Sequence, residues 1–384
     1  MKQAGVSNLT SHLLTHQRKI VLPGGKLDLA WTERGWKIDD LCAFAARKNQ
    51  RRGFLLVSRV LGRHVPARPS VIRAASDDLA SLISGDLKGP VLFLGMAETA
   101  ISLGQAVHDR WRCLHDRFDS LYLHSTRQQL GSEPLLRFSE PHSHACAHLL
   151  YTPDEEVWPH RLDSVRSLVL VDDEVTTGRT FVNLVTCLTP HLPSLERTEI
   201  AVLTDWSCGH YLRKIPYLVS SSSLLEGELV WEALPDPDPP LLDTTGQLGR
   251  LDQRRNVGRL GSNGLSFNFT KIIDNLDVTK ATPLHVIGTG ELHYPALLLA
   301  ELLEQAGYDV LLQATTRSPA RIGGAISAAL VLVDNYGTGV PNYLYNTPET
   351  GSRRRIVCHE TGSQWLDPAL VRSGDIVLDF GALE

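Results

Sequence analysis

The stretch VLVDDEVTTGRT, residues 169 to 180, decides the fold class of this 384-residue chain. An apolar run from Leu168 to Val171 ends at two adjacent carboxylates, Asp172 and Asp173, and a turn rich in threonine and glycine follows. A helical pattern then covers Thr180 to Leu188. This order predicts a strand, a turn and a helix, a unit typical of mainly parallel sheets that bind ligands at the carboxyl ends of their strands.

The residue types in this stretch indicate the chemistry of the ligand. Asp172 and Asp173 can accept hydrogen bonds from the two hydroxyls of a ribose ring. Gly178 can take a positive φ, and the turn around it presents donors at a helix amino end, where phosphate binds well. The predicted phosphate turn consists of Thr176, Thr177, Gly178, Arg179 and Thr180. A sugar with a phosphate on carbon 5 suits two sites so close together.

The same stretch has two alternative interpretations. One is a surface strand end with an ordinary turn, which would not explain why strand, acidic pair and turn occur in this order. The other is a Walker-type nucleotide loop, which is excluded because the chain has no Gly-x-x-x-x-Gly-Lys.

Strands and helices alternate through much of the chain. The expected elements of the first part are a hairpin over Lys19–Leu29, a helix over Asp39–Arg47, strands over Val91–Gly95, Leu121–Leu123 and Glu199–Thr204, and a helix over Ala97–Val107. The alternation stops between Glu232 and Gly264, which is rich in Pro, Asp and Gly, and resumes near Leu284. We therefore predict an α/β domain with an amino-terminal hairpin over residues 1–234, a linker over 235–265, and a second, smaller Rossmann-like α/β domain over 266–384.

Composition limits the classes of function. The chain is 42% hydrophobic and 21% charged, with a net charge of -5, so a general nucleic-acid binder or a membrane-surface protein is not expected. No apolar run has the roughly 18 to 20 residues that a membrane span needs, and the amino-terminal segment lacks the apolar core of a secretory signal. The six cysteines are scattered without a Cys-x-x-Cys pair. These features favour a cytoplasmic protein.

A basic cluster lies in the first part of the chain. Its members are Arg51, Arg52, Arg59, Arg63 and His64. Such a cluster is usually a solvated face, and in an acidic protein it can also line an anion site.

Residues 169 to 180 resemble the phosphoribosyl pyrophosphate (PRPP) signature of type I phosphoribosyltransferases. The chain departs from that pattern at Glu174, where an aliphatic residue is usual, and at Arg179, where glycine is commonest. The resemblance implies the type I phosphoribosyltransferase fold, with a pyrophosphate-binding loop after an earlier strand that often contains a non-proline cis peptide. Gly95, Met96, Ala97 and Glu98, in the segment GMAET, occupy that place. Glu98 has a simpler interpretation too, as an acidic residue in the first turn of a helix.

A wider resemblance covers most of the chain from about Lys19. The segments His124–Arg127, Glu140–Ala145 and Thr315–Pro319 are similar to a bacterial family that joins an orotate phosphoribosyltransferase-like domain to a TRSP domain and occurs beside tellurite-resistance and stress genes. The resemblance implies Mg2+-dependent transfer of phosphoribosyl from PRPP to a nucleobase-like acceptor, in biosynthesis of a nucleoside-like metabolite. Ser125, Thr126 and Arg127 would then contact the pyrophosphate, and the catalytic residues would be Asp172, Asp173 and Arg127.

In this family a mobile loop closes over the sugar, and Gln128 to His148 corresponds to it. The histidines in this span are His142, His144 and His148. They can supply charge or acid/base function, or simply belong to the loop or core. A His-x-His pair also suggests a transition metal, but no third ligand has suitable spacing. We therefore predict no metal site made by protein side chains.

The second domain has three polar turns that each follow a predicted strand. The candidate residues there are Glu291, Thr316, Arg317, Ser318 and Asp334, with Tyr345 and Asn346 near by. Strand ends that meet at one edge make a site. The alternative is that these turns only cap the elements beside them.

Two further functions stay open at this point. One is a regulatory protein that senses PRPP or a base without catalysis, and the other is a nucleotide hydrolase or phosphorolytic enzyme. The expected partners are PRPP and a small nucleobase-like acceptor, with no membrane and no general nucleic-acid binding. A homodimer is compatible with each of these functions.

Overall fold

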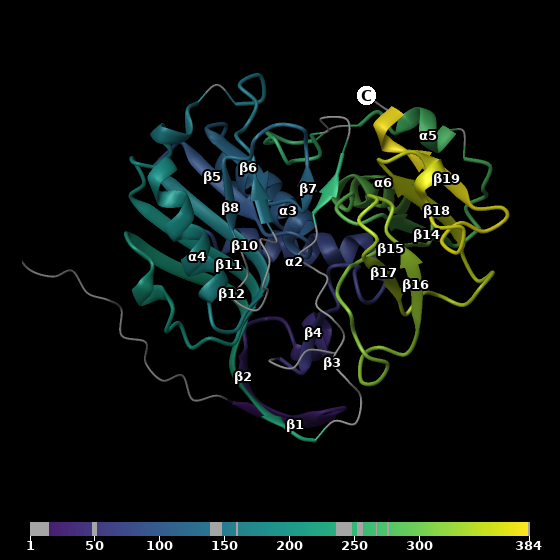
Figure 1. The fold of residues 1–384 in the computed structure, drawn as a ribbon, viewed down its shortest axis with the longest axis horizontal. Helices are drawn as coiled ribbons and strands as arrows, with labels where there is room; N and C mark the ends of the chain where they lie inside the picture. The colour runs from purple at the N-terminus through teal and green to yellow at the C-terminus, as the bar shows by residue number, and fades with distance from the viewer. Residues whose placement is uncertain are drawn as a thin grey trace, which may run out of the picture.

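A computed structural model describes residues 15–47, 52–138, 148–158, 160–235, 248–251, 256–265, 267–274 and 276–382. Its largest sheet has seven strands in the order β1-β2-β12-β11-β10-β5-β6. These strands are β1 His16–Leu22, β2 Gly25–Glu33, β12 Leu218–Ala233, β11 Arg197–Asp205, β10 Ser167–Val175, β5 Val91–Gly95 and β6 Ser120–His124. The five from β12 to β6 are parallel, and β1 and β2 add an antiparallel hairpin. The predicted mainly parallel α/β sheet and amino-terminal hairpin are confirmed (Figure 1).

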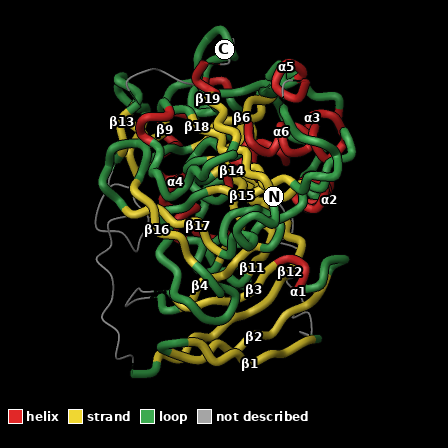
Figure 2. Tube along the Cα trace, turned by 90° about the vertical axis from the view of Figure 1, so that its right-hand side faces the viewer, coloured by secondary structure: helices red, strands yellow, loops and turns green. Residues whose placement is uncertain are grey.

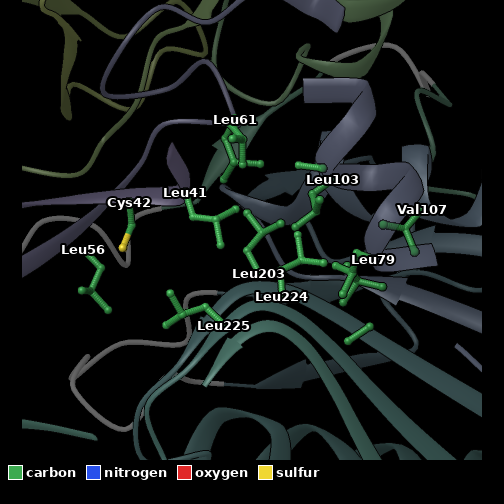
Figure 3. Packing of buried hydrophobic residues seen from close by; sticks show 14 of the residues in the cluster. Leu41, Cys42, Leu56, Leu61, Leu79, Leu103, Val107, Leu203, Leu224 and Leu225 are labelled. Atoms are coloured by element: carbon green, nitrogen blue, oxygen red, sulfur yellow. The ribbon is translucent and has the colours of Figure 1, made fainter. Parts of the chain in front are cut away.

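Both faces of this sheet are covered, because successive residues of each central strand point to opposite sides. Helices α2 Pro69–Ser81 and α3 Ala100–His115 share one core cluster with alternate strand residues such as Phe93 and Val169. Helix α4 Arg179–Leu188 packs on the other face with Leu92 and Leu168. Leu79, Leu103 and Val107 from the helices meet Leu203 and Leu224 from the strands in Figure 3.

The helix predicted over Asp39–Arg47 is wrong. Helix α1 covers only Ile38–Leu41, and the chain continues as β3 Cys42–Ala46, paired antiparallel with β4 Phe54–Ser58. Phe44 packs in the core of the large sheet, whereas Ala45 belongs to a separate cluster with Tyr345 of the second domain. A short apolar strand buried on both faces has no alternation of polar and apolar residues, so its pattern does not separate strand from helix.

The carboxyl-terminal region contains a second, parallel sheet in the order β15-β14-β18-β19. Its strands are β14 Leu284–Gly288, β15 Val310–Ala314, β18 Arg354–His359 and β19 Ile376–Asp379, with helices α5 Thr270–Asp274 and α6 Tyr294–Gln305 and an antiparallel pair, β16 Ala329–Val333 and β17 Pro341–Tyr345. Figure 2 shows α5, α6 and β19 of this region toward the end of the molecule opposite β1 and β2. The region is α/β as expected, and its Rossmann-like classification stays a prediction.

Small pairs of strands complete the first region. They are β7 Gln128–Gln129 with β13 Gly249–Arg250, and β8 Leu136–Phe138 with β9 His148–Leu150. Within the described part of the chain, no helix is long and apolar enough to cross a bilayer.

The two sheets are joined through a shared layer of helices. Helix α2 packs against both α3 and α6, and Arg73 on α2 makes a forked ion pair with Glu301 on α6, at 2.7 and 2.8 Å. The segment after β4 also extends the second sheet, because Ala67 and Leu312 of β15 exchange backbone hydrogen bonds of 3.0 and 2.8 Å. The first region therefore supplies part of the second sheet's edge.

Part of the predicted linker is built into this junction. Ser262 exchanges backbone hydrogen bonds of 3.0 and 2.8 Å with Tyr122 of β6, which covers an edge strand of the large sheet. Arg259 has no exposed surface and donates to two carboxylates of the second region, Glu291 at 2.9 Å and Glu360 at 2.7 and 2.8 Å. The boundaries 1–234, 235–265 and 266–384 stay predictions, but residues 256–262 pack as part of the core.

Replacement of Arg259 should destabilise the protein strongly. The Arg259→Met variant leaves the buried carboxylates of Glu291 and Glu360 without their cation, and breaking a buried ion pair in this way costs about 3–5 kcal/mol. Urea unfolding followed by circular dichroism should show a clearly lower midpoint. Arg161→Ala is the control, because Arg161 pairs with Asp163 at the surface, and its midpoint should stay at the wild-type value. Equal midpoints for both variants would contradict a stabilising role for the buried ion pairs of Arg259.

Candidate active site

One cavity lies where the carboxyl ends of strands from both sheets meet. From the large sheet it receives the loop after β5 and the end of β10, from the β3–β4 region several basic and apolar side chains, and from the second sheet the turn after β15. Its lining comprises Arg47, Arg52, Leu55, Leu56, His64, Met96, Ala97, Glu98, Thr99, Arg127, Asp172, Asp173, Glu174, Val175, Thr176, Thr177, Gly178, Thr180, Phe181, Thr316, Arg317 and Ser318.

The predicted phosphate turn has the expected backbone form. Gly178 has φ 65° and directly precedes α4, so the first amides of that helix lie at the cavity. A Cβ at Gly178 would lie 2.0 Å from the ring of Tyr211, so only glycine fits there. Arg179 is exposed and does not line the cavity, in contrast to the other four residues predicted for the turn.

The acidic residues belong to the strand itself, because β10 continues to Val175 instead of ending at Val171. Asp172 accepts a hydrogen bond of 3.0 Å from the backbone N–H of Asp173, and Asp173 accepts one of 2.9 Å from the Thr99 hydroxyl. Burial and the neighbouring charge of Asp173 raise the pKa of Asp172 well above its ordinary value. The pair therefore holds its charge at a cost, which bound hydroxyl donors or a cation would reduce.

Glu174, one of the two departures from the signature, also lines this cavity. It pairs with Arg52, which precedes β4. Burial raises the pKa of the Glu174 carboxyl to about 7, although Arg52 opposes the shift. The unusual residue thus carries a charge that changes near neutral pH.

The loop after β5 is held by hydrogen bonds on the side away from the cavity. The Ala97–Glu98 peptide bond is cis, and Met96, Ala97, Glu98 and Thr99 line the cavity, whereas Gly95 is buried behind them. The Ala97 N–H donates to the Ser125 hydroxyl at 2.9 Å. Ser125 in turn contacts Nδ1 of His148 at 3.0 Å. The segment predicted to bind pyrophosphate therefore forms one wall of the cavity.

Of the three residues Ser125, Thr126 and Arg127, only Arg127 lines the cavity. Thr126 donates its hydroxyl proton to Glu291 at 2.6 Å, and the Arg127 N–H donates to the same carboxylate at 2.7 Å. Direct contacts of Ser125 and Thr126 with pyrophosphate stay predictions, and in this structure both residues support the loops around the cavity.

The residues predicted for a separate site in the second domain divide into two groups. Thr316, Arg317 and Ser318 line the same cavity as Asp172 and Asp173. Glu291 and Asp334 stand behind it: Glu291 anchors Arg127, and Asp334 lies 3.8 Å from Arg317 and accepts hydrogen bonds from Thr338 and Asn342. Tyr345 and Asn346 also lie outside the lining.

Glu98 connects the two parts of the cavity. Its carboxylate accepts hydrogen bonds from the Thr316 hydroxyl at 2.9 Å and the Arg317 N–H at 3.2 Å. Its backbone carbonyl accepts one of 2.7 Å from Arg63. Burial opposes its charge, yet Arg63, Arg127 and Arg317 outweigh burial and hold the pKa of Glu98 below its ordinary value. Glu98 therefore stays ionised amid three arginines. This favours a place in the predicted pyrophosphate-binding loop over the simpler interpretation as an acidic residue in the first turn of a helix.

The basic cluster of the first part supplies residues that the motif did not reveal. Arg52 and His64 line the cavity, Arg63 is buried behind it and Arg59 is exposed. Burial and the nearby arginines lower the pKa of His64 to about 4, so it is neutral at physiological pH. The anion site stays a prediction for this cluster, and Arg47 is a further basic residue of the lining.

Among the described residues, no three His, Cys, Asp or Glu side chains come together as a metal-binding group. His142, His144 and Arg51 lie outside the described residues. His148 is buried in β9 and stacks on Phe138.

Comparison with known families gives two matches that together span most of the chain. Residues 41–228 match a family model described as phosphoribosyl transferase, and residues 261–369 match one described as "TRSP domain C terminus to PRTase_2". No curated protein matches the chain.

Solved structures similar to parts of the chain include three phosphoribosyltransferases. Orotate phosphoribosyltransferase from Aeropyrum pernix is 16% identical over 44% of this chain and 78% of that one, with a TM-score of 0.28. Adenine phosphoribosyl transferase from Trypanosoma brucei, in complex with AMP, pyrophosphate and ribose-5-phosphate, is 13% identical over 54% and 86%, with a TM-score of 0.31. Adenine phosphoribosyltransferase from Leishmania donovani is 12% identical over 60% and 87%, with a TM-score of 0.34.

The raised pKa of Glu174 has a consequence for stability. A carboxyl whose pKa rises from 4.5 to about 7 on folding stabilises the folded state fully below pH 4.5, and this stabilisation is lost as pH rises through 7. Glu174→Gln does not titrate. In EDTA, the free energy of unfolding of the wild type minus that of the variant should therefore fall by roughly 3 kcal/mol between pH 4.5 and 8. If the difference in the free energy of unfolding does not depend on pH, the raised pKa of Glu174 is contradicted.

Proposed function

This chain belongs to the family in which a phosphoribosyltransferase domain is followed by a TRSP domain, and we propose that it transfers 5-phosphoribosyl from PRPP to a nucleobase-like acceptor and releases pyrophosphate. The observation that carries the proposal is the single cavity in which the acidic pair Asp172 and Asp173, the turn before α4 and the loop after β5 lie together. Each of the three suits a different part of PRPP.

The turn before α4 suits the 5-phosphate, because helix N–H groups and the hydroxyls of Thr176, Thr177 and Thr180 line that end. The carboxylates of Asp172 and Asp173 suit the 2- and 3-hydroxyls of the ribose. The loop Met96–Thr99, together with Arg127, then faces the pyrophosphate. This assignment accounts for the position of the motif residues that line the cavity.

In the reaction, a nitrogen of the acceptor attacks carbon 1 of the ribose, and its proton passes to water or to the departing pyrophosphate. The bond between carbon 1 and the pyrophosphate oxygen breaks, and its electron pair leaves with the pyrophosphate. Positive charge develops on the sugar and negative charge on the leaving group, so the protein acts mainly by positioning and charge stabilisation. Asp172 and Asp173 hold the sugar, and Arg127 stabilises the leaving pyrophosphate.

The cavity also has suitable oxygen donors for Mg2+, since the carboxylates of Asp172 and Asp173 are hard ligands of the kind this cation takes. These two residues would hold it together with oxygens of PRPP. When bound, Mg2+ neutralises charge on the leaving group.

Arg317 gives the second domain a part in the same reaction. It lines the cavity beside Glu98, on the side of the loop assigned to pyrophosphate, and only 4% of its surface is exposed. A guanidinium suits phosphate oxygens, which it can contact through two N–H groups at once. We assign Arg317 to the pyrophosphate end of PRPP. The turn after β15, Thr316–Pro319, thus completes the site that the first domain begins.

The double variant Asp172→Asn, Asp173→Asn tests the function. Loss of two charged acceptors for the ribose hydroxyls should weaken binding of PRPP with Mg2+ about 100-fold or more in calorimetry. EDTA should weaken wild-type binding as well. Asp116→Asn is the matched control, because Asp116 is exposed and has φ 49°, which asparagine tolerates. A wild type that does not bind PRPP, or a double variant that binds it normally, would refute the proposal.

Product analysis separates this proposal from its two rivals. Wild-type protein incubated with PRPP, Mg2+ and a panel of nucleobases should release pyrophosphate and form a nucleotide detectable by mass spectrometry. Binding without turnover would point to a sensor, and free base released from added nucleotides would point to a hydrolase.

The Arg317→Ala variant tests the shared site. A charged hydrogen bond is worth about 1.5–3 kcal/mol, so PRPP binding should weaken roughly 10- to 100-fold, and Arg317→Lys should recover part of the loss. Arg161→Ala serves as the surface control. Wild-type PRPP affinity in a folded Arg317→Ala protein would assign the arginine to structure alone.

A further inference from the structure

A second cavity opens at the carboxyl edge of the smaller sheet and shares no lining residue with the first. Its volume is about 620 Å3, within the range of small-molecule sites. Polar side chains come from the turn after β16, the segment after β18 and the end of β19. Those on which the argument depends are Asn335, Tyr336, Glu360, Thr361, Trp365 and Asp379.

The cavity is at the position where open parallel sheets bind ligands. The chain runs from β14 to β15 on one side and then to β18 on the other side of β14, so the order of strands reverses between β14 and β18. Crevices outside the carboxyl ends of strands at such a point are the usual ligand sites of this architecture. Asn335 marks this point, because its amide donates to Thr289 after β14 at 3.4 Å and to Thr361 after β18 at 2.9 Å.

The polar groups of the cavity are fixed before any ligand arrives. Glu360 is 2% exposed and accepts two hydrogen bonds from Arg259, at 2.7 and 2.8 Å, and one of 2.7 Å from the Tyr336 hydroxyl. Asp379, the last residue of β19, accepts one of 2.9 Å from the Gly381 N–H. Carboxylates, amide and hydroxyl held in place in this way suit a ligand with several hydroxyl groups.

Trp365 adds a flat apolar surface to this polar cavity. Its side chain is 60% exposed, whereas the six other tryptophans are buried or half-buried. An exposed indole at the edge of a polar cavity can bury its face against a ligand, and an aromatic or sugar ring suits that face. Arg250 also lines the cavity, and Arg259 compensates the charge of Glu360.

We propose that this cavity binds a nucleoside-class ligand, with its hydroxyls at Glu360, Thr361 and Asp379 and its base on Trp365. The site is separate from the PRPP cavity and does not depend on the reaction proposed there.

Calorimetry on the full chain with adenosine and uridine tests this site. Wild-type protein should bind at least one of the two nucleosides. Trp365→Ala and Asp379→Asn should each weaken nucleoside binding at least 10-fold. Val331→Ala is the matched control, because Val331 is exposed on β16 of the same region and outside the cavity, and this variant should bind as the wild type does.

Two further measurements separate this site from the first cavity. Thermal melting should show that Trp365→Ala and Asp379→Asn are folded, and the Asp172→Asn, Asp173→Asn protein should retain nucleoside binding. Absence of binding to both nucleosides, binding that survives both Trp365→Ala and Asp379→Asn, or loss of binding in the Asp172→Asn, Asp173→Asn protein would each overturn the proposal. Failure of PRPP binding leaves all of these outcomes readable.

Discussion

The buried guanidinium of Arg63 is the contact on which the arrangement of the two sheets depends. It donates to the backbone carbonyls of Glu98 at 2.7 Å, Gly290 at 2.9 Å and Thr315 at 2.8 Å. These carbonyls follow β5, β14 and β15, so one cation holds the carboxyl edge of the large sheet against that of the small one. Burial lowers the pKa of Arg63, and the carboxylates of Glu98 and Glu291 oppose that effect. The first cavity, which residues from both sheets line, depends on this contact of Arg63 between the two sheets.

Arg259 makes a second junction of the same kind and lies between the two cavities. It joins Glu360, which lines the second cavity, to Glu291, whose carboxylate holds the Arg127 N–H beside the first. Arg259 satisfies both carboxylates, and its charge outweighs burial, which acts in the opposite direction, so that the pKa of Glu291 is about 2. A group that displaced Glu360 would leave the charge of Arg259 partly uncompensated, so the geometry around Arg127 depends on polar contacts in the small sheet.

The phosphoribosyl signature could be predicted because it depends on neighbouring residues. The features that depend on packing between distant segments could not be predicted. Asp172, Gly178 and their neighbours are consecutive, so strand, turn and helix follow from a few residues of sequence. Thr316 and Arg317 were expected in a site of their own because nothing local shows that their turn would meet Glu98, 218 and 219 positions earlier. The helix predicted over Asp39–Arg47 is wrong at Cys42–Ala46 because this strand is buried on both faces, so its residues do not alternate between polar and apolar.

The turn after β15 also explains how part of the cavity is ordered by contacts within the protein. Thr316 and Arg317 are almost fully buried and are held by Glu98, so the conformational entropy of these side chains is lost on folding and not on binding. Without them the carboxylate of Glu98, which is half-buried in the loop after β5, would lack two of its donors, and leaving a charge without partners away from water is costly. The loop after β5 is therefore stabilised by the second domain, because that loop carries a carboxylate whose hydrogen-bond donors include Thr316 and Arg317.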